Sequence, residues 1–300
     1  VAKALKNLAY KNKQNQYAIR NLGGINSLVT LLGQATEEET KYNVAEALNN
    51  LAASNSENQD AIRNAGGIAL LVLFLCSTEK EESKRKISCV LDNLAFKNTE
   101  NKHVITITKY IARLVDMLNQ AIQEEIKCNA ILEVSQLAYK NTVNQHAIRD
   151  LGGIGPLVAL LDQATQEETK CNAAKALKNL AYKNTKNQHV IRDWGGIAPL
   201  VALLDQARQE KTTYDAILAV AQLAYNNAKN QRAIRDLGVI KKLETLLDQT
   251  QGNHQIEILT RVLAILNNTP TNPCTIKKAK ETQPTESSPA NEKKRKRDES

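Results

Sequence analysis

Residues 176–204 read ALKNLAYKNTKNQHVIRDWGGIAPLVALL, and nearly the same words return along most of the chain. Residues 4–32, for example, read ALKNLAYKNKQNQYAIRNLGGINSLVTLL. The first residue of the Asn-Leu-Ala word, or of its variant, recurs every 43 residues without insertion or deletion at Asn7, Asn50, Asn93, Gln136, Asn179 and Gln222. A repeat period between about 20 and 50 residues predicts a protein built from stacked repeats.

One unit of this pattern, residues 12–54, predicts three helices. Asn12 is a suitable N-cap for the first helix, and the Gly23-Gly24 pair allows a sharp turn because glycine adopts the required backbone angles at little cost. The predicted elements are helix 14–22, the Gly-Gly turn, helix 25–32, a polar linker 33–38 and helix 39–53. The third helix carries an apolar stripe that one unit cannot bury alone, so we expect neighbouring units to stack.

The Asn-Leu-Ala word, then NxxNQxAI, then GGIxxLVxLL together resemble the armadillo repeat of beta-catenin, plakoglobin and yeast vacuolar adaptor proteins. The resemblance covers residues 1–268. It implies an all-α fold, a right-handed superhelical solenoid of three-helix armadillo repeats, whose third helices line a concave groove that binds partners. We therefore expect the end of a truncated first repeat at 1–11 and six armadillo repeats of 43 residues at 12–268. Because Val1 already stands inside a helical pattern, we also expect a fragment or processed product.

The recurring amides, which we call the amide row, lie along one edge of the third helices, beside the buried stripe. A side-chain amide offers two donors and an acceptor, which suits it to clamp the backbone of an extended peptide. The resemblance implies the same role. Helices about 10 Å apart, against a rise of about 3.3 Å per extended residue, give about three peptide residues per repeat. The alternative is that the amides cap or brace neighbouring helices.

Charged side chains accompany the amide row. The candidate peptide-binding charges are Lys3, Glu46, Lys86, Lys97, Lys140, Lys175 and Lys183. With Lys11, Arg261 and Asp215 added, the groove positions hold eight positive and two negative residues. A basic groove favours an acidic or phosphorylated protein segment. The alternative is that the lysines complement the dipoles of the helix ends.

Two other classes of armadillo protein remain as alternatives. In importin-alpha-like carriers a Trp stands four residues before each amide, whereas this chain has Lys3, Glu46, Cys89, Leu132, Lys175 and Leu218 there. The chain therefore resembles those nuclear transport adaptors less. The second alternative is the substrate-binding half of a larger ubiquitin ligase whose catalytic domain would precede Val1.

Catalysis, metal binding and cofactor binding find no support in the sequence. His103, His146 and His189 are one position of successive units, so they stand about 10 Å apart and cannot share a zinc ion with bonds of about 2 Å. There is no phosphate loop and no nucleophile elbow. With few aromatic residues for stacking, nucleic acid is an unlikely partner. The longest apolar run, 68–76, is nine residues, whereas a membrane span needs about 20.

Three departures from the repeat pattern carry their own expectations. Lys109-Tyr110 replaces the Gly-Gly pair, which indicates either a local change in the superhelix or simple drift. We expect Trp194, which replaces a leucine of the other units, to fill the core. We expect the five cysteines to be buried, reduced thiols.

Residues 269–300 hold four of the six prolines and few apolar residues, which predicts a disordered basic tail. Its basic clusters are Lys277, Lys278, Lys280, Lys293, Lys294, Arg295, Lys296 and Arg297. They are similar to a bipartite nuclear-localisation signal, which implies an importin-type receptor as partner and a protein of the nucleus and cytoplasm. Taken together, the sequence predicts a non-enzymatic scaffold that binds an extended, acidic peptide and carries its own localisation signal.

Overall fold

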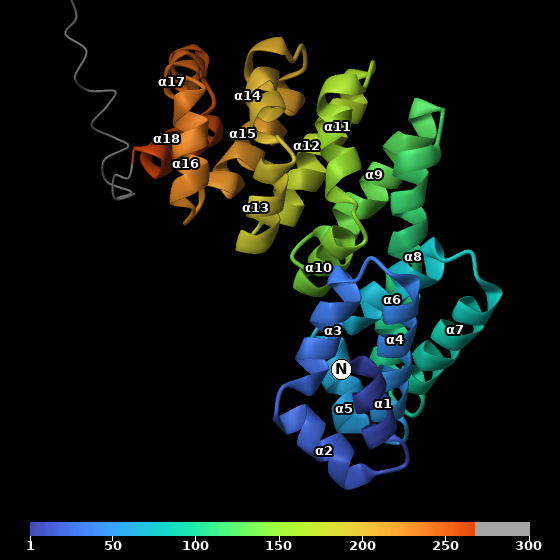
Figure 1. Cartoon of the computed structure of the whole chain (residues 1–300). Coiled ribbons are helices and arrows are strands. Elements are labelled where there is room, and N and C mark those ends of the chain that lie inside the picture. Colours follow the sequence, from blue (N-terminus) through green and yellow to red (C-terminus); the bar gives the residue numbers. More distant parts are fainter. Residues whose placement is uncertain (268–300) are drawn as a thin grey trace, which may run out of the picture.

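The computed structural model describes residues 1–267, which form helices joined by short loops and contain no strand (Figure 1). The predicted tail at 269–300, with its localisation signal and Cys274, lies outside the described residues. No single helix within residues 1–267 is long and apolar enough to cross a membrane, and one pair of helices meets those criteria only together, with a bend of 76° between them.

The helices recur with the 43-residue period of the sequence. The first helices of the units are α2 (Lys13–Asn21), α5 (Ser56–Asn64), α10 (Thr142–Asp150), α13 (Thr185–Asp193) and α16 (Ala228–Asp236). The second helices are α3 (Gly24–Gln34), α6 (Gly67–Ser77), α11 (Ile154–Gln163), α14 (Ile197–Gln206) and α17 (Val239–Gln249). The third helices are α1 (Ala2–Ala9), α4 (Glu38–Ala52), α7 (Glu81–Ala95), α9 (Glu124–Ala138), α12 (Glu167–Ala181), α15 (Glu210–Ala224) and α18 (Asn253–Leu266). One longer helix, α8 (Thr99–Gln120), stands apart from this scheme.

Local chemistry explains where the helices begin and turn. The side chain of Asn12 accepts a hydrogen bond from the backbone N–H of Asn15 and so caps α2. Gly23 adopts a φ of 75°, which non-glycine residues rarely take. A Cβ atom on Gly24 would lie 2.6 Å from Cγ2 of Ile19, so the second glycine provides space. The two glycines therefore have different tasks at the same turn.

The core forms between successive third helices. In α4 the predicted stripe is fully buried, with Val44, Ala47, Leu48 and Leu51 at 0% exposure. Helix α4 packs on α1, and α12 packs between α9 and α15. Alanines on the contact faces let these helices approach closely, so the stripe of one unit is covered by the next.

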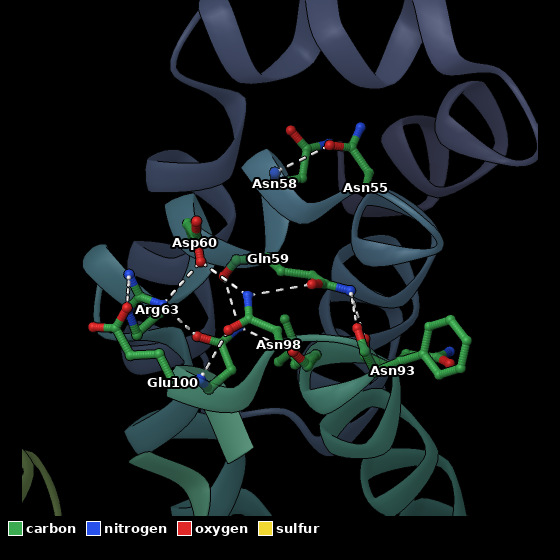
Figure 2. Close-up of polar contacts among 11 residues, drawn as sticks. Asn55, Asn58, Gln59, Asp60, Arg63, Asn93, Asn98 and Glu100 are labelled. Atoms are coloured by element: carbon green, nitrogen blue, oxygen red, sulfur yellow. Dashed lines mark hydrogen bonds and ion pairs between the residues drawn. The ribbon is translucent and has the colours of Figure 1, made fainter. Parts of the chain in front are cut away.

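A buried glutamine on the first helix ties two successive third helices together. Gln59 donates its Nε2 N–H groups to the carbonyl oxygen of Asn93 in α7 at 2.9 Å (Figure 2) and to that of Ala52 in α4 at 3.3 Å. We call these bonds the glutamine link. Gln16, Gln145 and Gln188 make it between α1 and α4, α9 and α12, and α12 and α15. The carbonyls of Ala52 and Asn93 also accept a backbone N–H of the turn that follows each helix, so the glutamine gives each of them a second donor.

The third unit departs from this plan because it has no turn between its first two helices. Helix α8 continues for 22 residues through Lys109 and Tyr110, which stand where the other units have the glycine turn. The sequence left two alternatives here, a local change in the superhelix or simple drift, and the structure shows a local change. The expectation of three helices in every unit is wrong here, since without a residue suited to positive φ the two segments join into one helix.

The same unit also lacks the glutamine link. Lys102 occupies the position of Gln59, and its exposed side chain bonds to neither α7 nor α9 within residues 1–267. Helix α9 is not packed along α7 as α12 is packed along α9. Instead α8 packs against α6 and α7 as well as α9 and α10, and Figure 1 shows two stacks of helices, α1–α7 and α9–α18, joined by α8.

Two sequence-based expectations about single side chains are wrong. Trp194 is 62% exposed, with its ring against Gly155, where a Cβ atom would lie 3.1 Å away. The residue follows the end of α13 at the outer surface, so it covers α11 without entering the core.

All four described cysteines are free, but Cys76 and Cys89 are exposed and only Cys128 and Cys171 are buried.

Candidate functional site

Two hollows open on the face shared by the third helices of the C-terminal stack. The α9–α12 hollow has a volume of about 360 Å³, and its lining includes Gln136, Tyr139, Lys175 and Asn179. The α15–α18 hollow has a volume of about 350 Å³, and its lining includes Tyr182, Lys183, Leu218, Gln222, Tyr225, Ile258, Arg261 and Ile265. Many of these residues occupy equivalent positions of successive units, so both hollows lie along one face. We call this face the candidate groove.

The amide row divides into two groups. Asn50 donates to the carbonyl oxygen of Lys6 at 2.9 Å, Asn93 donates to Oδ1 of Asn49 at 2.7 Å, and Asn179 donates to the carbonyl oxygen of Ser135 at 2.9 Å. Each of these three amides thus braces its helix against the preceding third helix. This is the structural role that the sequence analysis gave as the alternative to peptide binding. Asn179 is 7% exposed.

The other three amides make no such bond within residues 1–267. Gln136 and Asn7 are exposed, Gln222 is half-buried, and Gln136 and Gln222 line the two hollows. Their donors and acceptors are therefore open to a ligand. Peptide binding by the amide row stays a prediction, and the structure concentrates the available amides at the two hollows.

Both acids of the predicted groove are paired with lysines. Glu46 lies between Lys6 and Lys86, with Oε–Nζ distances of 2.7 and 2.6 Å. Burial alone would raise the pKa of Glu46, but the two lysines lower it overall, and the bond to Glu46 raises the pKa of Lys86. Asp215, whose side chain is 8% exposed, pairs with Lys178 at 2.6 Å.

The remaining cations of the candidate groove are uncompensated. Lys175, Lys183 and Arg261 form no ion pair within the part of the chain that the structure describes, although all three line a hollow. Since no Asp or Glu lines either hollow, the candidate groove carries net positive charge.

An aromatic residue followed by a lysine recurs at the C-terminal ends of the third helices, and the sequence analysis missed it. The lysine Nζ lies 5.1–5.5 Å from the centre of the preceding ring in the pairs Tyr10-Lys11, Phe96-Lys97, Tyr139-Lys140 and Tyr182-Lys183. The low overall content of aromatic residues concealed this row, although its period of 43 residues was visible. Tyr139 and Tyr182 stand at the two hollows.

The lysines of these pairs have left-handed backbone angles. Lys97, Lys140 and Lys183 have φ values of 51–53°, as do Ser54 and Asn226 at the equivalent positions. This conformation is unfavourable for a residue with a Cβ atom by about 1–2 kcal/mol, and Gly or Asn tolerates it best. Lysine thus stands in several units at a turn where the backbone does not favour it.

The predicted site residues do not form one continuous row. Lys86 and Asn93 lie on α7 of the N-terminal stack with Glu46 beside them, and Lys3 is exposed on α1. The row resumes at Gln136 on α9, but α9 is not packed along α7. Within residues 1–267 no group of three or more His, Cys, Asp or Glu residues could hold a metal ion.

Comparisons with known proteins support the repeat and the helical fold. The family model of the Armadillo/beta-catenin-like repeat matches residues 12–53 and 141–182. No curated protein sequence matches the chain. An engineered protein of known structure is similar at 28% identity and a TM-score of 0.51, covering 82% of this chain and 97% of that one.

Designed armadillo repeat proteins are similar as well. One has 26% identity and a TM-score of 0.51, covering 81% of this chain and 100% of its own. Another was solved in complex with the peptide (KR)4. It has 25% identity and a TM-score of 0.50, and the match covers 81% of this chain and 99% of that one. Residues 12–53 and 141–182 thus match the armadillo repeat, and the helical solenoid of this chain is similar to those of designed armadillo repeat proteins, which supports an armadillo repeat protein.

Proposed function

We propose that this armadillo scaffold binds an extended, acidic protein segment in the candidate groove. The observation that carries the proposal is the charge of the two hollows. Lys175, Lys183 and Arg261 are uncompensated there, whereas both acids predicted for the groove are already paired. Complementary charge selects the partner and speeds its association.

A similar designed protein supports peptide binding, although its peptide is basic. That protein is solved in complex with the basic peptide (KR)4. The candidate groove of the present chain carries lysines and an arginine, so we expect it to favour a ligand of negative charge. Four third helices about 10 Å apart would accommodate about nine extended residues along α9, α12, α15 and α18.

A direct test measures binding of the full chain to nine-residue peptides that are acidic, phosphorylated, neutral or basic. We expect the acidic and phosphorylated peptides to bind and their affinity to fall with salt, since exposed charges are screened. The double variant Lys175→Gln, Lys183→Gln should weaken binding about tenfold, equivalent to about 1.4 kcal/mol. Lys229→Gln, which removes an exposed charge from α16, is the matched control.

The opposite preference would overturn the proposal. Tighter binding of basic peptides would contradict the charge argument and favour an importin-alpha-like carrier. Equal loss of affinity in Lys175→Gln, Lys183→Gln and in Lys229→Gln would place the ligand elsewhere on the surface.

We also propose that the basic clusters at 277–280 and 293–297 act as a nuclear-localisation signal read by an importin-type receptor. Their composition supports this, since a basic segment suits an acidic receptor groove. Deleting residues 292–300 should leave a fluorescent fusion in the cytoplasm. Unchanged nuclear accumulation of the deletion would refute it.

A further inference from the structure

The last third helix reverses the polar pattern of the other third helices. Ile265 of α18 stands in the amide row, where α12 has Asn179 and α15 has Gln222. Ile258 stands seven residues earlier, where α12 has Asn172 and α15 has Asp215. Both isoleucines are half-buried and pack against the core, and both line the α15–α18 hollow.

The α15–α18 hollow therefore has an apolar interior and a basic edge. Leu218 and Tyr225 of the α15 side face Ile258 and Ile265 of α18 across it. Lys183 and Arg261 supply two cations, and no Asp or Glu is part of the lining. Helices α15 and α18 pack less closely than α12 and α15, so the space between them stays open. Its volume of about 350 Å³ is within the range of about 300–1,000 Å³ typical of ligand pockets.

We infer that the α15–α18 hollow takes one bulky apolar side chain of the acidic segment, with an adjacent carboxylate held by Lys183 and Arg261. The inference rests on the proposed function and adds an anchor position to it. Burial of a leucine or aromatic side chain supplies affinity that charge alone does not, because apolar surface leaves water. Charge complementarity decides the occupant: a basic segment, the chain's own tail at 269–300 included, would be repelled by the two cations.

The test compares two acidic nine-residue peptides that differ at one central position, leucine or serine, by fluorescence anisotropy with the full chain. We expect the leucine peptide to bind about tenfold more tightly. In Ile265→Gln, which installs the residue of the equivalent position in α15, that advantage should disappear while the serine peptide binds as before. Arg261→Gln, a change at an exposed side chain, should weaken both peptides.

The control is Ile122→Asn, which removes a 99% exposed isoleucine between α8 and α9, and it should keep the tenfold difference. Equal affinity of the leucine and serine peptides for the native chain would overturn the anchor but leave the proposed function standing. Tighter binding of a basic leucine peptide or of a single-stranded oligonucleotide would overturn the assigned occupant. Failure of every acidic peptide to bind would refute the proposed function itself.

Discussion

Gln59 donates a hydrogen bond to the carbonyl oxygen of Asn93 at 2.9 Å, and through it α5 holds α7 in place beside α4 (Figure 2). One repeat later Lys102 replaces this glutamine, and α9 is not packed along α7. The glutamine link is thus present at four junctions of third helices and absent from α7–α9. At the α15–α18 junction Gln231 makes only the bond to Ala224 of α15.

The glutamine link should be visible in stability. We expect Gln59→Ala to lower the free energy of unfolding by about 1–3 kcal/mol, because the hydrogen bonds of its amide to the carbonyls of Ala52 and Asn93 are lost in the interior. Lys102→Ala, at the equivalent exposed position, should change it by less than about 0.5 kcal/mol. Urea unfolding followed by circular dichroism measures both, and equal losses would mean that the link contributes nothing specific.

The continuity of α8 should depend on the residues that replace the glycine turn. We expect the double variant Lys109→Gly, Tyr110→Gly to lose about 1–2 kcal/mol of stability, since each glycine in a helix interior costs about 1 kcal/mol relative to alanine. We also expect its small-angle scattering curve to change as α8 bends. Lys109→Ala, Tyr110→Ala keeps good helix formers there and serves as the control, and a curve that differs equally from native would contradict this view.

The lysine at the left-handed turn after α9 should oppose stability and support binding. Lys140→Asn should raise the free energy of unfolding by about 0.5–1 kcal/mol, because asparagine tolerates a positive φ better than lysine. The same variant should bind acidic peptides more weakly. The reverse change, Asn226→Lys after α15, should have the opposite signs, measured by thermal unfolding and peptide titration. A Lys140→Asn variant with unchanged peptide affinity would assign the lysine a purely structural role.

Stability should fall in acid through Glu124. Burial alone would raise the pKa of this carboxylate, but hydrogen bonds from Thr165 and from the backbone of Gln166 lower it from 4.5 to about 2. The folded state therefore binds this proton less readily than the unfolded state does. Its contribution is complete above pH 4.5 and disappears as the pH falls toward about 2.

Glu124→Gln should accordingly flatten the pH dependence of the melting temperature between those two values. Glu125→Gln, which alters the exposed neighbouring residue, is the matched control. Identical melting profiles for Glu124→Gln and the native chain would show that the hydrogen bonds of Glu124 to the next repeat are unimportant.

The sequence by itself determined the repeating helices, their caps and their buried stripes. Asn12 caps a helix, Gly23 turns the chain and Leu48 lies in the stripe because each depends on residues within a few positions along the chain. The 43-residue period then applies this local chemistry to the other units, except at the glycine turn of the third unit, so the stack of helical repeats could be predicted from the sequence.

Only the tertiary structure decided which of the equivalent side chains remain available. Asn179 and Gln136 occupy the same position of adjacent third helices, yet the first bonds to Ser135 and the second opens into a hollow. Helical periodicity determines the face of its own helix on which a residue lies. Whether its polar atoms meet a partner depends on the distance to the next helix, which packing sets. Packing at α8 and at α18 differs from that of the other repeats. The division into two stacks follows from the first difference, and the α15–α18 hollow follows from the second.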